Sequence, residues 1–281
     1  MSTPEDPAKA TARSPFAGCA IFICVGLMMI FLIVVSIVTF YRQYHAIAKF
    51  TDDQPVPVAI TSTEGREAEL NQLAERLETF RQDLVDDKDS TLALSADDLN
   101  TALAVYEPLK DFRGTLRVEE IGEKNLRIAV SFPLNGKPRL TKEGESGIIT
   151  TDRRYLNGTL IAQPELFEGE MVLQISDIQV PGKTVAKEFI ERMSPHRITE
   201  RYKDDPVIGA SMKKLTGVEI SGGKLVLRRK GGEKIVTTIT DKQVDAASGR
   251  LFRFLGVAAS IFLIFVAGVL FLGLRKKRSD A

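Results

Sequence analysis

The feature that most constrains this chain is an apolar run without a formal charge near its carboxyl end, residues 254–274, which four basic residues follow at 275–278. At a rise of about 1.5 Å per residue, a helix of that length matches a hydrocarbon core of about 30 Å. A similar run, residues 16–41, lies near the amino terminus. The sequence therefore predicts two transmembrane helices, 16–41 and 254–274, with a domain between them.

The basic tail, residues 275–281, sets the predicted orientation, because short flanks rich in Lys and Arg resist translocation and stay in the cytoplasm. With two spans, residues 1–15 are cytoplasmic as well, and this polar, proline-containing tail is predicted to be disordered. The run at 16–41 is longer than the roughly 7–15 apolar residues of a secretory signal, which favours an uncleaved anchor. We expect a two-pass protein of a bacterial inner membrane, with its central part in the periplasmic or extracellular space.

The region between the spans contains about 210 residues, enough for one domain of medium size. We assign residues 42–61 to a linker, 62–85 to an amphipathic juxtamembrane helix, 90–240 to an extracytoplasmic α+β domain and 241–253 to a second linker. Both cysteines, Cys19 and Cys24, lie in the first apolar run, so the domain contains neither a disulfide nor a thiolate.

Composition and motifs argue against several functions. The formal net charge of the chain is +1, and without a concentrated basic face we expect no nucleic acid partner. His45 and His196 are the two histidines, and neither has a second histidine or a cysteine nearby, so no metal is expected. Ser211 and Lys214 fit a Ser-x-x-Lys pattern, but the companion elements of that enzyme class are missing. We therefore expect a protein that is not an enzyme and has no cofactor.

The predicted helix at 62–85 has an apolar stripe, because its apolar residues recur every three or four positions. The stripe consists of Leu70, Leu73, Leu77, Phe80 and Leu84. Two interpretations fit it. The stripe could form a short coiled-coil seam between two copies of the chain, with Leu70, Leu73, Leu77 and Phe80 as oligomerisation residues, or it could pack on its own domain. Two heptads are short for a coiled coil, which favours packing within the chain.

Residues 90–240 alternate short helices with antiparallel strands. Ser95 and Asp98 form a capping box in front of a helix that Pro108 ends. Residues 116–119 and 126–132 predict a hairpin, a polar loop follows at 135–147, and a third strand region at 148–162 is interrupted at 152–154. The apolar positions of 171–180 change parity, which predicts a bulge near Ser176. A last hairpin turns at Gly222-Gly223. The fold class is α+β, with a curved antiparallel sheet and packed helices.

Several short motifs resemble those of YpmS-like bacterial membrane-anchored exterior proteins, and more distantly tubular lipid-binding (TULIP-like) domains. They are Leu94-Ser95-Ala96-Asp97-Asp98-Leu99-Asn100, Tyr155-Leu156-Asn157-Gly158, the stretch from Gly169 to Val180, and Pro181. The resemblance implies a curved antiparallel sheet that wraps a helix and shelters lipid. A second membrane span departs from that plan, which has one anchor.

One apolar face could serve a ligand. Its predicted residues are Leu99, Leu103, Tyr106, Leu116, Val118, Leu126, Ile128, Val130 and Phe132. They would line either a closed core or an apolar groove. The leading hypothesis is a domain that binds a lipid or another apolar ligand without catalysis, with the lipid bilayer as its other partner. The alternative is an envelope scaffold that forms a homodimer through the 62–85 helix or holds another envelope protein.

Overall fold

The computed structural model describes residues 15–147, 149–235, 237, 239 and 260. The chain divides into two units, one of residues 1–42 with 248–281 and one of residues 43–247. The first unit contributes most of helix α1, Pro15–Ala48. Within it, Val25–Ala48 is long and apolar enough to cross a membrane, with a mean hydropathy of 2.2, and a signal sequence has the same character. The tail 1–14, the linker 241–253, the basic tail and the second predicted span, apart from residue 260, lie outside the described residues.

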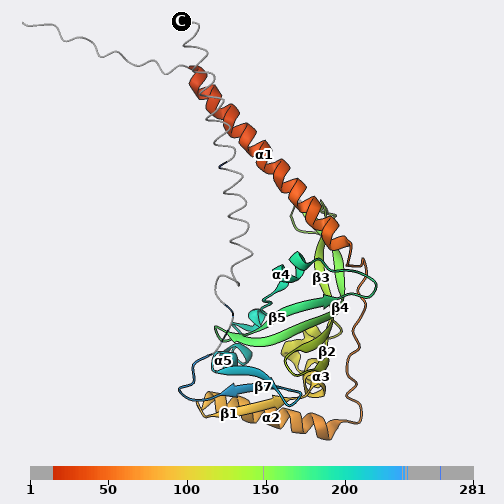
Figure 1. Ribbon diagram of the computed structural model, residues 1–281, viewed down its shortest axis with the longest axis vertical. Coiled ribbons are helices and arrows are strands. Elements are labelled where there is room, and N and C mark those ends of the chain that lie inside the picture. Colours follow the sequence, from red (N-terminus) through yellow and green to blue (C-terminus); the bar gives the residue numbers. More distant parts are fainter. Residues whose placement is uncertain (1–14, 148, 236, 238, 240–259, 261–281) are drawn as a thin grey trace, which may run out of the picture. The chain divides into compact units, whose positions relative to one another are not determined.

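The second unit is an α+β domain, which confirms the predicted fold class (Figure 1). Its helices are α2 Glu67–Val85, α3 Ala96–Val105, α4 Lys187–Met193 and α5 Ile208–Met212, with the 3-10 helices η1 Glu107–Phe112 and η2 Glu200–Tyr202. Its strands are β1 Ser90–Leu94, β2 Leu116–Ile121, β3 Leu126–Leu140, β4 Ile149–Phe167, β5 Glu170–Gln179, β6 Gly217–Ser221 and β7 Lys224–Arg229. They form two antiparallel sheets, in the orders β2-β3-β4-β5 and β1-β7-β6.

The local signals at both ends of the domain are confirmed. Ser95 caps α3, and its Oγ accepts from the Asp98 amide at 3.1 Å while Asp98 Oδ2 accepts from the Ser95 amide at 2.8 Å. The β6–β7 turn is Gly222-Gly223 with φ of +58° and +69°, where glycine avoids steric strain. These signals depend on a few neighbouring residues, which is why the sequence reveals them.

The four-stranded sheet departs from the prediction in its long arm. β3 continues to Leu140 and pairs with β4 from Ile149, so residues 135–140 of the predicted loop at 135–147 are strand, and β4 is not interrupted at 152–154. Backbone pairing needs no apolar side chains, and an irregularity between Asn135 and Pro138 accommodates the proline. The polar sequence of this arm therefore indicated a loop where the chain forms an exposed ribbon.

The bulge in β5 is confirmed. Ile161 pairs with Asp177 and Ala162 pairs with Ile175, so Ser176 is the extra residue. Ile175 and Ile178 are both buried as a result, although they lie on opposite parities in the sequence. The bulge keeps one face of the strand apolar on both sides of it.

Helix α2 packs on its own domain. Leu73, Phe80 and Leu84 are buried in a cluster with residues of β1 and with Leu166 and Leu215, and Leu77 packs against the same cluster. Leu70 is half-buried. Leu73 and Phe80 are thus buried within the chain, which is the interpretation of this stripe that the sequence favours.

The predicted linker 42–61 is largely ordered structure. Helix α1 continues to Ala48, and Phe50 is buried, with its ring 4.7 Å from that of Phe189. Asp52 and Tyr155 then exchange two backbone hydrogen bonds, of 2.9 and 2.7 Å. The prolines of this segment indicated an extended conformation, but the sequence did not show that the segment pairs with the domain.

Candidate functional site

The predicted ligand face contains a cavity of about 160 Å³ inside the larger hydrophobic cluster. Six of the nine predicted residues line it: Leu99, Leu103, Leu116, Val118, Leu126 and Ile128. The other three lie elsewhere. Tyr106 follows the end of α3 and is 38% exposed, Val130 is buried away from the cavity wall, and the half-buried Phe132 has its ring 6.3 Å from that of His196.

The rest of the wall comes from residues that the sequence did not indicate as ligand-binding. These residues are Ala102, Leu109, Phe112, Met171, Leu173, Ile198, Thr199, Tyr202, Ile208 and Leu225. They belong to α3, η1, β5, the η2 region, α5 and β7, so the cavity is closed by elements that are distant in sequence. Tyr202 lies in a polar stretch without periodicity, and no local pattern indicates that it is buried.

A buried amide fixes α3 against the sheet. Asn100 donates through Nδ2 to the Val118 carbonyl at 2.7 Å and accepts the Val118 N–H through Oδ1 at 2.8 Å. These two bonds satisfy the backbone of β2, which is an edge strand. Asn100 therefore sets the position of Leu99 and Leu103 over the strand residues of the cavity wall.

The segment around η2 and α5 closes the other side. Gly209 is buried in α5, and a Cβ on it would lie 2.5 Å from the Tyr202 carbonyl oxygen, so only glycine allows this close approach. Arg197 forms a bidentate pair with the buried Glu170, with bonds of 2.9 and 2.7 Å, and His196 pairs with Leu173 through the backbone. These contacts hold Tyr202 in the cavity wall.

Among the described residues, Tyr202 and Thr199 are the two hydroxyl residues of this wall, and Tyr202 is the one whose hydroxyl has no partner. The residue is 8% exposed, and its hydroxyl is buried without a hydrogen bond of normal geometry to any described residue. Its ring centroid is 6.2 Å from that of Phe112, and the Arg201 guanidinium lies over the Phe112 ring at 5.0 Å. Burial raises the pKa of the Tyr202 hydroxyl, so it remains protonated at neutral pH.

The volume of the cavity restricts what can enter. Engineered apolar cavities of about 150 Å³ bind benzene or xenon, whereas pockets for drug-sized ligands span about 300–1,000 Å³. A whole lipid therefore does not fit, but the end of an acyl chain or a small ring does. The interior is a packed core that contains a cavity. This arrangement is intermediate between the closed core and the apolar groove that the sequence left open.

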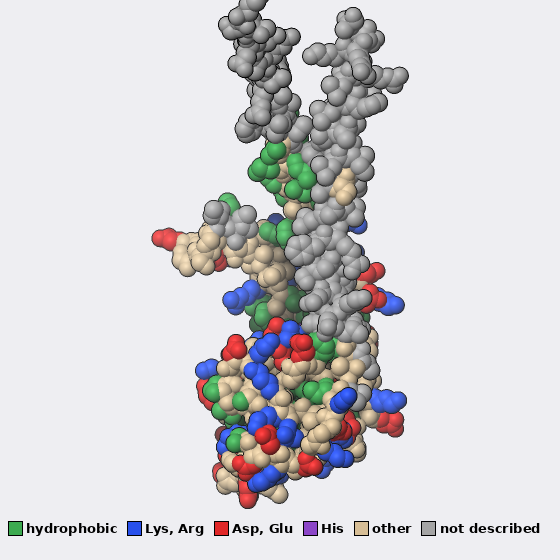
Figure 2. All heavy atoms as spheres, turned by 90° about the vertical axis from the view of Figure 1, so that its left-hand side faces the viewer, with side chains coloured by type: hydrophobic (Ala, Val, Ile, Leu, Met, Phe, Trp, Pro, Cys, Tyr) green, Lys and Arg blue, Asp and Glu red, His purple; other side chains and the backbone are tan. Residues whose placement is uncertain are grey.

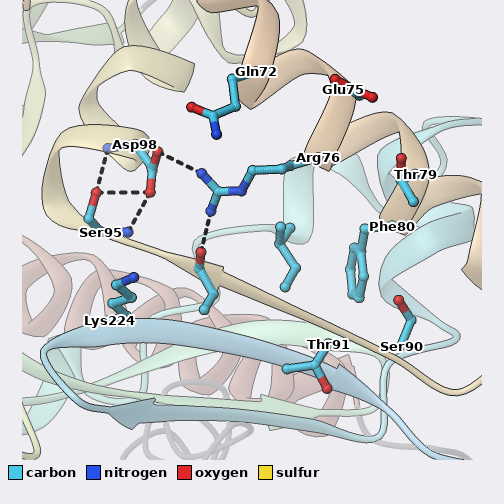
Figure 3. A pocket seen from close by; sticks show the side chains of 12 residues that line it. Gln72, Glu75, Arg76, Thr79, Phe80, Ser90, Thr91, Ser95, Asp98 and Lys224 are labelled. Atoms are coloured by element: carbon cyan, nitrogen blue, oxygen red, sulfur yellow. Dashed lines mark hydrogen bonds and ion pairs between the residues drawn. The ribbon is translucent and has the colours of Figure 1, made fainter. Parts of the chain in front are cut away.

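A second hollow, a groove of about 600 Å³, lies between α2 and β1 (Figure 3). Arg76 extends from α2 across it, donating to Asp98 at 3.1 Å and to the Ala93 carbonyl. Figure 3 shows Phe80 pointing from the same helix toward β1. The groove is lined by Gln72, Glu75, Arg76, Thr79, Phe80, Ser90, Thr91, Leu92, Ala93, Ser95, Asp98 and Lys224. Through these bonds Arg76 links α2 to α3 and to β1, so we call this side chain the brace.

The outer surface carries both signs of charge. Figure 2 shows Lys and Arg side chains interspersed with Asp and Glu over one face of the domain. Within the described ranges, no group of three or more His, Cys, Asp or Glu side chains is placed to hold a metal ion.

Comparison with protein-family models, with characterised proteins and with solved structures gave no match to this chain. The functional argument therefore depends on the geometry of the domain.

Proposed function

We propose that this chain is a membrane-anchored binding protein of the bacterial cell envelope. In this proposal its extracytoplasmic domain takes the apolar end of a lipid or lipid-like molecule into the cavity beneath α3, without catalysing a reaction. The observation that carries the proposal is the cavity itself. Six residues that the sequence predicts to bind an apolar ligand line a single hollow of about 160 Å³.

The energetics favour occupancy of such a cavity. Empty apolar cavities cost about 24 cal/mol for each Å³, so one of about 160 Å³ costs about 4 kcal/mol. An apolar group that enters recovers contacts with the wall and leaves water at the same time. A domain without disulfides has a small stability margin, so a cavity of this cost is better explained by a ligand than by imperfect packing.

The membrane part of the proposal rests on different residues. Val25–Ala48 has the length and hydropathy of a span, which supports an anchor at the amino-terminal end. The second span is inferred from the apolar run at 254–274 and its basic tail. Together they would place the domain outside the inner membrane, where acyl chains are available.

The test is to fill the cavity. In Leu103→Trp, the larger side chain should occupy the hollow, and apolar molecules that co-purify with the full-length protein in detergent should decrease at least tenfold, as measured by mass spectrometry. Leu140→Trp is the matched control, because Leu140 is 72% exposed at the end of β3 and does not line the cavity. The control should keep its bound molecules.

A milder filler protects the test against misfolding. Ala102 also lines the cavity, and Ala102→Leu adds less volume than Leu103→Trp. If both variants melt cooperatively and still recover the same apolar molecules as the wild type, the cavity is not the binding site and the proposal is wrong.

A further inference from the structure

We infer that the molecule bound in the cavity carries a neutral carbonyl oxygen, as an acyl ester or ketone does, and that this oxygen accepts a hydrogen bond from the Tyr202 hydroxyl. The inference rests on the proposed function and makes it more specific. The ligand is then an acyl compound that places its apolar end in the cavity and its carbonyl oxygen at the Tyr202 hydroxyl.

The first argument is the unpaired donor. Buried hydroxyls are nearly always hydrogen-bonded, and a buried one without a partner destabilises the fold. The Tyr202 hydroxyl is such a group, in a residue that lines the cavity and is 8% exposed. Thr199, the other hydroxyl residue of the lining, is already satisfied, since its Oγ1 accepts from the Met171 amide at 2.8 Å and donates to the Met171 carbonyl at 3.3 Å.

The second argument is that the charged neighbours of Tyr202 leave its O–H hydrogen without an acceptor. Arg201 lies beside the hydroxyl and lowers its pKa, against the larger effect of burial, but a guanidinium only donates. Asp205 accepts instead from the amides of Val207 and Ile208, at 2.9 and 2.7 Å. Asp111 accepts from Arg201 at 3.3 Å. No described residue has hydrogen-bonding geometry to the hydroxyl, so an acceptor for its hydrogen would come from another molecule.

The third argument selects a carbonyl among possible acceptors. An alcohol or an amine would bring its own hydrogen into a wall of apolar side chains, where that hydrogen would find no acceptor. A carboxylate would lose its hydration among these apolar side chains, and the nearby Arg201 guanidinium is already paired with Asp111. A neutral carbonyl has two lone pairs and no hydrogen, so it suits the Tyr202 donor and leaves no polar group unpaired.

The experiment compares two probes of the same shape. In 2-hexanone a carbonyl oxygen occupies the place of the terminal methylene of 2-methyl-1-hexene. Both are titrated into the full-length protein in lipid nanodiscs, and affinities are measured by ligand-detected NMR. We expect the ketone to bind about tenfold more tightly than the alkene to the wild type, in line with one hydrogen bond gained in a desolvated site. Tyr202→Phe should abolish this preference.

The matched control is Tyr106→Phe, because Tyr106 does not line the cavity and the residue is 38% exposed. This variant should keep the tenfold preference. A wild-type protein that binds ketone and alkene equally, or a Tyr202→Phe variant that keeps the preference, would overturn the inference while leaving apolar binding in place. If neither probe binds the wild type, the inference and the proposed function both fail.

Two further measurements complete the test. Hexanoate at neutral pH should bind more weakly than 2-hexanone, and tighter binding of hexanoate would overturn the assignment of a neutral carbonyl. The carbonyl carbon of ¹³C-labelled 2-hexanone should shift downfield on binding to the wild type, as hydrogen-bonded carbonyls do. This measurement of the ¹³C chemical shift uses the wild type alone and does not require that Tyr202→Phe folds. The absence of a shift would also overturn the inference.

Discussion

The two hollows of the domain differ in how their polar groups are satisfied. The groove beside β1 is the larger, at about 600 Å³, but Arg76 spans it and bonds to both Asp98 and the Ala93 carbonyl. The cavity beneath α3 is about 160 Å³, and Tyr202 contributes a buried hydroxyl without a hydrogen bond of normal geometry to the residues that the structure describes. Volume alone would select the groove. The unpaired Tyr202 donor makes the cavity the better candidate for a ligand site, because Arg76 in the groove already has partners within the protein.

The largest expected effect comes from placing a charge in each hollow. Ile128→Asp puts a carboxylate on the cavity wall, where the native side chain is 3% exposed, and should lower the free energy of unfolding by several kcal/mol. Thr91→Asp puts the same group on the exposed rim of the groove and should change the stability by about 1 kcal/mol or less. Urea denaturation measures both. Similar losses in the two variants would mean that the hollows do not differ as described.

A smaller effect should follow from removing the brace. Arg76→Met keeps most of the side-chain volume but loses the bonds to Asp98 and Ala93, so stability should fall by about 1 kcal/mol. Binding of 2-hexanone should not change, because Arg76 does not line the cavity. Arg81→Met is the control for a surface ion pair, since Arg81 bonds to Glu78 on the exposed side of α2. A weaker ketone affinity in Arg76→Met would show that the groove and the cavity are coupled.

The smallest effect has the opposite sign. Without ligand, Tyr202→Phe removes an unpaired buried donor and keeps the ring. The free energy of unfolding should therefore stay the same or rise by up to about 1 kcal/mol, and the melting temperature should follow it. In the presence of 2-hexanone the wild type should gain more stability than the variant. Thermal unfolding with and without the ketone measures this. A variant that melts lower than the wild type without ligand would indicate that the hydroxyl has a partner within the protein.

The features that the sequence predicted correctly are local. The capping box at Ser95, the bulge at Ser176 and the turn at Gly222 each depend on a few adjacent residues, and all three occur in the structure. The α3 and hairpin part of the cavity wall was also accessible, because Leu99, Leu103 and Ile128 repeat at helix or strand spacing.

The features that the sequence missed depend on contacts between distant segments. Tyr202 meets Phe112 across about 90 residues of chain, and no periodicity marks either as part of a cavity. Nothing in the sequence indicates that Asn100 is buried, because its partners are the backbone groups of Val118, 18 residues away. The length of the stripe on α2 favoured packing within the chain, but the sequence did not show that β1 is what it packs against.

The segment that follows α1 has a mechanical consequence. The Asn157 side chain accepts from the Val56 amide and the Ser131 hydroxyl, and it donates to Asp52 and to the Gln54 carbonyl. A flexible linker of about 20 residues would allow the domain to move tens of ångströms from the end of the helix. Here residues 52–56 are hydrogen-bonded to Asn157 in the middle of β4, so this segment cannot extend as a free linker unless these bonds break.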